Sequence, residues 1–175
     1  MTIIKIVLLV IALVIVILLS LYCYLSPGNS LPDNLKADSL KVIKSDRVLQ
    51  IIKGNEVVKE YKIALGPNPK GHKTEQGDGK TPEGIYTIDY RNPKSKYHLS
   101  LHISYPNKAD RNNAIENGRH PGGNIFIHGL PNKSFDWGRF HSLVDWTLGC
   151  IAITNEEIEE LWRVCPNSTP IEIIP

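Results

Sequence analysis

Apolar and polar residues alternate along most of the chain after residue 34, as expected for β-strands that bury one face. Residues 42–66 alternate well, and Ser45-Asp46 and Gly54-Asn55 interrupt the alternation with residue types that favour turns. This segment therefore predicts three antiparallel strands. Five further strands are predicted from apolar runs at residues 84–89, 99–105, 124–129, 150–154 and 170–174. Loops rich in Gly and Pro separate these runs, and the longest covers residues 67–84.

Helical patterns are few. A short helix is predicted near residues 108–117, and a second begins at Thr154 or Asn155. The second has a capping residue and two glutamates in its first turn, which suit the positive end of a helix dipole. Many short strands with few helices predict a mainly β domain, built as a β-sandwich or a closed sheet.

The N-terminal pattern is different, because residues 6–21 form an almost unbroken apolar run (IVLLVIALVIVILLSL) after a single charge at Lys5. With the residues that follow, the run approaches the ~20 residues that a membrane-spanning helix needs. We predict an uncleaved transmembrane anchor in residues 1–25, with the next domain outside the cytoplasm. A cleaved signal sequence is the alternative, but the small residues that cleavage needs are missing after the run.

Residues 26–34 (SPGNSLPDN) favour neither helix nor strand and are predicted to be a linker. Residues 35–175 are then long enough for one domain with a hydrophobic core. The chain has 20 basic and 18 acidic residues. This balance gives no electrostatic reason to expect a nucleic-acid partner.

His128 ends one apolar run, and Cys150 begins another. A thiol and an imidazole at the ends of neighbouring strands are what Cys–His nucleophilic catalysis needs, because the imidazole takes the proton of a mostly protonated thiol. A disulfide between Cys150 and Cys165 is the structural alternative. The helix predicted between the two cysteines tends to separate them and favours a nucleophile. Zinc is disfavoured because no C-x-x-C or H-x-x-x-H spacing accompanies Cys150.

Five segments, taken in order, resemble the YkuD-type L,D-transpeptidase catalytic domain, a family of cysteine enzymes that remodel peptidoglycan. They are GDGKTPEGIYTI (77–88), LHISYPN (101–107), PGGNIFIHG (121–129), DWTLGCIAITNEEIEELW (145–162) and PNSTPIEII (166–174). In this family a His-Gly pair precedes a Ser/Thr-x-Gly-Cys motif. The sequence here resembles a branch with a D-W-T-x-G-C-I-A signature. The resemblance covers most of residues 35–175 and implies a YkuD-like fold.

The resemblance also implies a mechanism. Cys150 would attack the carbonyl between the third residue of a peptidoglycan stem peptide and its terminal D-alanine. His128 would act as general base and then general acid, oriented by the carbonyl of Gly129. Backbone N–H groups around Gly149 and Cys150, helped by the Thr147 hydroxyl, would hold the oxyanion. The thioester would pass to an amine acceptor, either a second stem peptide (a 3-3 cross-link) or a protein, with no cofactor or metal implied.

Two positions depart from the family pattern, because many relatives have His in place of Leu148 and Arg or Asn near the position of Ala152. The second change removes a likely ligand for a substrate carboxylate, so other residues must place the substrate. The candidates for substrate binding are Asp145, Trp146, Arg139, His141 and His120. His141 could instead be a surface residue or a competing base.

The predicted anchor and the family resemblance together imply a bacterial protein of the cytoplasmic membrane with a single span, whose catalytic domain faces the periplasm or cell wall. Two other functions stay open. One is an exported cysteine peptidase or amidase on the same scaffold, which hydrolyses stem-peptide or protein–peptidoglycan bonds. The other is a catalytically silent wall-binding module, against which the retained Cys150 and His128 argue. Transfer and hydrolysis differ in how well the site excludes water, which the sequence does not show.

Overall fold

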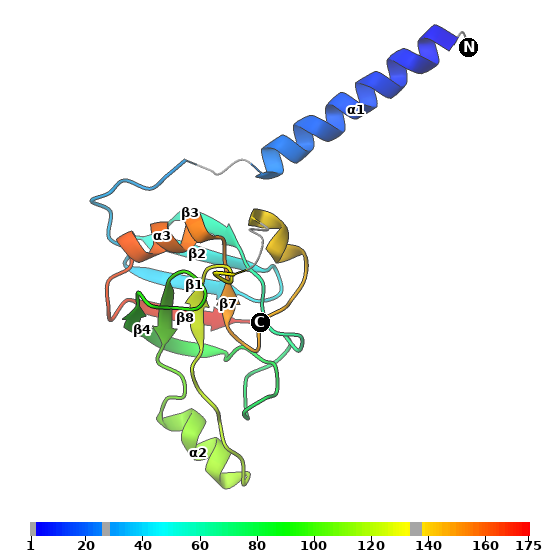
Figure 1. Ribbon diagram of the computed structural model, residues 1–175. Coiled ribbons are helices and arrows are strands. Elements are labelled where there is room, and N and C mark those ends of the chain that lie inside the picture. The colour runs from blue at the N-terminus through cyan, green and yellow to red at the C-terminus, as the bar shows by residue number, and fades with distance from the viewer. Residues whose placement is uncertain (1–2, 26–28, 134–137) are drawn as a thin grey trace. The chain divides into compact units, whose positions relative to one another are not determined.

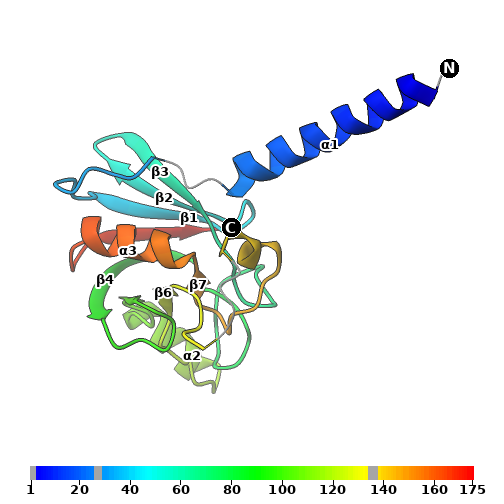
Figure 2. The same cartoon turned by 45° about the horizontal axis from the view of Figure 1, so that its top comes forward.

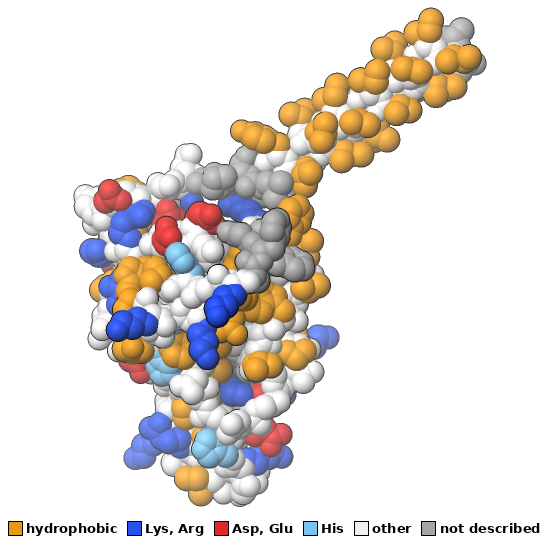
Figure 3. Space-filling view, in the orientation of Figure 1, with side chains coloured by type: hydrophobic (Ala, Val, Ile, Leu, Met, Phe, Trp, Pro, Cys, Tyr) orange, Lys and Arg blue, Asp and Glu red, His pale blue; other side chains and the backbone are white. Residues whose placement is uncertain are grey.

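The computed structural model describes residues 3–25, 29–133 and 138–175. The chain divides into two units, residues 1–30 and residues 31–175. The first contains helix α1 (Ile3–Leu25). Figure 3 shows apolar side chains along this helix, and the stretch from Ile3 to Tyr22 is long and apolar enough to cross a membrane. A signal sequence has the same properties, so the helix fits either an anchor or a signal.

The second unit is mainly β, which confirms the predicted fold class. Its strands are β1 (Ser39–Ile43), β2 (Val48–Lys53), β3 (Glu56–Lys62), β4 (Gly84–Asn92), β5 (Ser100–Ile103), β6 (Phe126–His128), β7 (Ile151–Ala152) and β8 (Pro170–Ile174). The helices are α2 (Lys108–Glu116), α3 (Asn155–Val164) and the 3-10 helix η1 (Gly138–Leu143). The alternation of side chains predicted every strand, although β6 and β7 are shorter than their apolar runs. The sequence did not predict η1.

The strands form one curled sheet in the order β3-β2-β1-β8-β4-β5-β6-β7 (Figures 1 and 2). The first three strands form the predicted antiparallel meander. The last strand, β8, inserts between β1 and β4 and runs parallel to β1, with Leu40 beside Ile171. Strand β8 therefore joins the first three strands to the rest of the sheet.

The two edges of this sheet meet. Ala64, just after β3, pairs with Ala152 of β7 through two backbone hydrogen bonds, N–H to O, of 3.0 Å and 2.9 Å. Closure satisfies backbone groups that an open edge would leave exposed. Of the two architectures left open by the sequence, the closed sheet is the one that forms.

Helix α3 covers part of the sheet, and Ile158, Leu161 and Val164 on its inner face are fully buried in the core. The predicted cap is present, because the Thr154 hydroxyl accepts the N–H of Glu157 at 3.2 Å and the Glu157 carboxylate accepts the N–H of Thr154 at 3.0 Å. This capping box fixes where α3 begins, just after the strand that follows Cys150.

Glu160 on α3 connects the helix to the sheet and to the start of the unit. Its carboxylate accepts the hydroxyl of Tyr61 in β3 and the N–H of Leu31, each at 2.6 Å. Leu31 lies within the predicted linker, and its side chain packs in the hydrophobic core. The packing of the second unit therefore extends to Leu31.

Replacement of Tyr61 by Phe should lower the free energy of unfolding by about 1–3 kcal/mol, because the buried Glu160 carboxylate loses a donor. Chemical denaturation of the full chain measures the change. Tyr90→Phe is the matched control, since Tyr90 lies on β4 and is 53% exposed. Equal effects at the two tyrosines would contradict the anchoring role of Tyr61.

Candidate active site

The candidate base ends one of two adjacent parallel strands, and the candidate nucleophile immediately precedes the other. His128 is the last residue of β6, and Cys150 immediately precedes β7. The register places Ile127 beside Ile151 and His128 beside Ala152. Both side chains line one cavity of about 710 Å³. The fold thus brings together the two residues that the sequence predicted to react.

The imidazole of His128 is buried, with 4% of the residue exposed. Its Nδ1 lies 2.7 Å from the carbonyl oxygen of Gly129. A carbonyl can only accept, so Nδ1 carries the proton and Nε2 is free to accept one from a thiol. Burial lowers the pKa of His128 to about 4, although the Gly129 carbonyl acts in the opposite direction. The ring is therefore neutral at neutral pH and has the tautomer that a general base requires.

Two aromatic residues surround this imidazole. The ring of Tyr97 lies 4.4 Å from that of His128, and the ring of Trp146 lies 5.7 Å from it at a steep angle. The Tyr97 carbonyl also accepts the N–H of Gly129 at 3.1 Å. Tyr97 thus restricts the imidazole through its ring and steadies the orienting residue through its backbone. Nothing in the sequence pattern indicated Tyr97, which lies in a loop before β5.

The Cys150 side chain is partly exposed, and its thiol lies 3.5 Å from the carbonyl oxygen of Asn124, which it can donate to. Burial raises the pKa of the Cys150 thiol, while the backbone N–H of Phe126 and the charge of Lys73 act against that rise. The resting pair is therefore a neutral thiol beside a neutral imidazole, and not a thiolate–imidazolium pair.

The turn before Cys150 requires glycine. Gly149 has φ of 117°, and a Cβ there would lie 2.5 Å from the carbonyl oxygen of Lys80. The Thr147 hydroxyl accepts the N–H of Gly149 at 3.1 Å and donates to the carbonyl of Cys150 at 2.8 Å. The Gly149 N–H, expected at the oxyanion, is thus engaged by Thr147. These contacts make Thr147 and Gly149 the residues that shape the turn.

Asp145, a predicted substrate ligand, lies outside the cavity lining. Its carboxylate binds Arg47, with Oδ2 and Nη2 2.6 Å apart, and accepts the N–H of Leu65 at 2.9 Å. Asp145 therefore ties the segment before Cys150 to the first strands of the sheet. Of the other predicted ligands, Trp146 and His120 do line the cavity.

Arg139 and His141 belong to η1 and are also absent from the residues that line the cavity. Arg139 faces α3, with its Nη2 atom 3.9 Å from Oε1 of Glu157. His141 is buried rather than at the surface, because the unpredicted 3-10 turn folds its side chain inward.

The two departures from the family pattern have different surroundings. Leu148 lines the cavity and is 86% exposed, so it contributes an apolar rim beside the candidate nucleophile. Ala152 is buried where the sheet closes and pairs with Ala64. Ala152 is not among the described residues that line the cavity.

Cys150 and Cys165 are both free thiols, so the alternative of a disulfide between them is not what the structure has. Cys165 is fully buried at the end of α3 and packs in the core, as its apolar neighbours predicted.

A second cavity of about 610 Å³ meets the first at the reactive pair. The two share Tyr97, Asn124, His128 and Cys150. Lys73 lines the first cavity, and Lys94 and Lys96 line the second. Among the described residues that line these cavities, none is an aspartate or glutamate. The charged side chains among these lining residues are therefore all basic.

Residues 37–173 match the model of the YkuD family, described as the L,D-transpeptidase catalytic domain, and the chain belongs to this family. A curated relative from Escherichia coli K12, named "Putative L,D-transpeptidase YafK", is 30% identical over 130 residues. The alignment covers 71% of this chain and 45% of the relative, so the chain spans less than half of that protein.

Solved structures share the fold. The helical cell shape determining protein Pgp2 from Campylobacter jejuni matches with a TM-score of 0.62 and 26% identity, over 86% of this chain and 50% of Pgp2. Bd1075 from Bdellovibrio bacteriovorus matches with a TM-score of 0.55 and 25% identity, over 83% of this chain and 50% of that protein. An L,D-transpeptidase from Mycobacterium smegmatis, with 12% identity and a TM-score of 0.54 over 79% of this chain and 59% of its own, shows similarity of fold alone.

The burial of His128 predicts a pH-dependent stability. Its pKa in the folded protein is about 4, below the ordinary value near ~6.5. Between these values the unfolded chain binds a proton that the folded chain does not, so stability falls as the pH is lowered through this range. Denaturation at pH 7 and pH 4 should show wild type losing on the order of 3 kcal/mol more than His128→Gln. Parallel losses in the two proteins would contradict a buried neutral imidazole.

Proposed function

We propose that this protein is a peptidoglycan L,D-transpeptidase with Cys150 as nucleophile and His128 as general base. One observation carries the proposal: a buried, neutral His128, oriented by the Gly129 carbonyl, shares a cavity with a cysteine at the junction of two cavities. A silent wall-binding module has no need of a buried imidazole held in the tautomer of a base.

The acylation step begins with transfer of the Cys150 thiol proton to Nε2 of His128. The thiolate attacks the carbonyl between the third stem residue and the terminal D-alanine, and we assign the Cys150 N–H to the oxyanion. The protonated imidazole then gives its proton to the leaving amine, so that D-alanine departs and a thioester remains. His128 is neutral again and can deprotonate the second nucleophile.

Two cavities that meet at the reactive pair suit a reaction with two substrates. One can hold the acyl donor while the other admits the acceptor, since both share Cys150 and His128. Stem peptides carry several carboxylates, and the lysines that line these cavities complement them. The acceptor would be the amine of a second stem peptide or of a protein.

A hydrolase on the same scaffold is the second candidate. None of the described residues that line the two cavities is acidic, so these surfaces provide no carboxylate to attract a cationic amine. Water is a neutral acceptor and needs no such partner. The thioester at Cys150 would then release a shortened stem or a detached protein.

For location, we propose that α1 anchors the protein in the bacterial cytoplasmic membrane, with the catalytic unit facing the periplasm or cell wall. The apolar length of α1 and the cell-wall role of the family support this placement. Structural similarity to the cell shape determining protein Pgp2 supports a role in wall remodelling.

Cys150→Ala should abolish covalent labelling by a carbapenem, because the β-lactam carbonyl would have no nucleophile to acylate. Intact-protein mass spectrometry measures the adduct. Cys165→Ala is the matched control and should keep the label, since Cys165 lies in the core away from the cavity. His128→Gln should slow labelling by about 10²–10⁴-fold through loss of the base. A label that survives in Cys150→Ala would overturn the nucleophile assignment.

An assay with purified disaccharide–tetrapeptide as substrate distinguishes transfer from hydrolysis. The enzyme should release D-alanine from it, and an added D-amino acid should appear at the vacated position. Mass spectrometry follows both products, together with dimers joined through two third residues. Tripeptide alone, even with abundant amine, would identify the hydrolase. An unchanged substrate would contradict both activities.

A further inference from the structure

Lys73 lies in the loop between β3 and β4 and lines the larger cavity together with Cys150. Only 3% of the residue is exposed, which is unusual for lysine. Its Nζ atom donates to the carbonyl of Glu75 at 2.9 Å and to Oδ1 of Asp78 at 2.7 Å. A buried ammonium is costly unless it is paired, so the chain keeps it here by holding two acceptors beside it.

Lys44 provides an internal comparison, because it is as deeply buried as Lys73 at 2% exposed. Its Nζ atom donates to the Gly71 carbonyl at 2.8 Å, the Thr81 carbonyl at 3.1 Å and Oε1 of Glu83 at 2.8 Å. An ammonium has three donors, so these contacts satisfy Lys44. Lys73 has two acceptors among the described residues. The third N–H of its ammonium can therefore donate to a ligand in the cavity.

Asp78 organises the loop that carries Lys73. Its carboxylate accepts the backbone N–H groups of Thr74 at 2.9 Å and Lys80 at 3.0 Å in addition to the Lys73 ammonium. Burial alone would raise the pKa of Asp78, but these bonds outweigh it and lower the pKa. Asp78 is therefore ionised and holds Lys73 in a fixed position.

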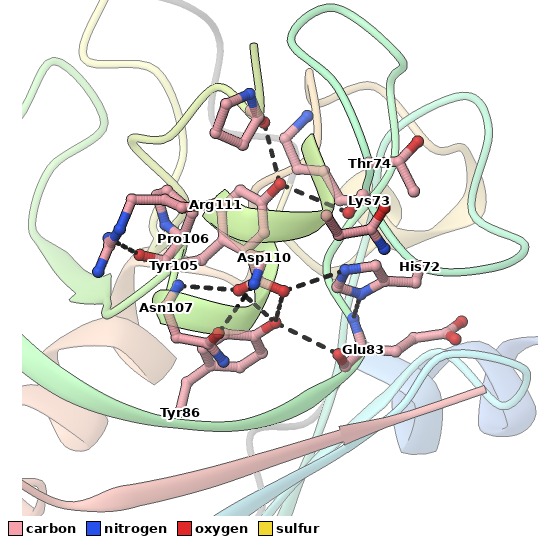
Figure 4. Close-up of polar contacts among 12 residues, drawn as sticks. His72, Lys73, Thr74, Glu83, Tyr86, Tyr105, Pro106, Asn107, Asp110 and Arg111 are labelled. Atoms are coloured by element: carbon pink, nitrogen blue, oxygen red, sulfur yellow. Dashed lines mark hydrogen bonds and ion pairs between the residues drawn. The ribbon is translucent and has the colours of Figure 1, made fainter. Parts of the chain in front are cut away.

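The neighbouring His72 secures the loop from its other side. Figure 4 shows its ring turned toward Asp110 of α2 and the backbone of Glu83. Nδ1 accepts the Glu83 N–H at 3.0 Å, and Nε2 lies 3.2 Å from Oδ1 of Asp110. Tyr86 of β4 donates to the same carboxylate at 3.1 Å. Lys73 is thus presented by a loop fastened to the sheet and to α2, which lowers the cost of binding a ligand.

We propose that Lys73 binds the free terminal carboxylate of the amino acid that leaves during acylation, an inference that rests on the proposed function. Among the described residues lining the larger cavity, Lys73 is the one lysine or arginine. The charge of Lys73 also acts on the Cys150 thiol, which places the two within electrostatic reach. Ala152 is not among the described residues that line the two cavities, so we assign to Lys73 the role that the family resemblance gave to an arginine near that position.

This assignment makes Lys73 a specificity-determining residue. A stem that ends in a free carboxylate at its fourth residue would match the vacant donor. A stem with an amidated end presents no charge to the ammonium. The enzyme should therefore distinguish two substrates that differ only in that end group.

The test compares disaccharide–tetrapeptide with its C-terminal carboxamide, using the full chain in detergent and release of the fourth residue as readout. Wild type should show kcat/KM higher for the acid by roughly 10- to 100-fold, as expected for a hydrogen bond between charged groups. Lys73→Met should remove this preference, because it lowers kcat/KM for the acid far more than kcat/KM for the amide. Lys73→Arg should retain the preference.

Lys70→Met is the matched control, since Lys70 is exposed on the same loop. The double variant Lys73→Met, Asp78→Asn avoids a buried unpaired carboxylate and should also lack the preference. Equal turnover of acid and amide by wild type would overturn the role of Lys73 while leaving the proposed reaction intact. So would equal losses on both substrates in Lys73→Met and in the double variant. Failure of wild type on both substrates would overturn the proposed function and this inference with it.

Discussion

The contact between Ala64 and Ala152 holds the candidate active site together. Strand β7 has just two residues and follows Cys150 directly. It is positioned by β6 on one side and by the two hydrogen bonds to Ala64 on the other. A strand this short has little stability of its own. The position of the candidate nucleophile therefore depends on closure of a sheet whose other edge lies almost ninety residues earlier in the chain.

Close backbone packing continues from that contact toward the cavity. A Cβ on Gly66 would lie 2.1 Å from the carbonyl oxygen of Gly79 and 2.9 Å from the nitrogen of Gly149. Two parts of the loop between β3 and β4 thus meet the turn before Cys150 where no side chain fits. Lys73 lies in the same loop as Gly79. The same packing therefore fixes the position of this loop relative to the turn that precedes Cys150.

The alternation of side chains predicted the strands because each buries one face, and the His-Gly and Gly-Cys segments indicated the reactive pair. The surroundings of that pair were harder to predict. Asp145 and Arg139 are predicted substrate ligands, but the structure places their side chains against Arg47 and Glu157. Tyr97 and Lys73 reach the cavity through loops whose paths depend on tertiary contacts, so no local pattern marks them.

Stabilising charges lie around the reactive pair and not within it. Arg47–Asp145 and Lys73–Asp78 fasten the flanking loops, whereas His128 and Cys150 are uncharged at rest. Oxidants such as peroxides react with thiolates far faster than with thiols. We therefore expect the Cys150 thiol, which stays protonated at rest, to react slowly with such oxidants.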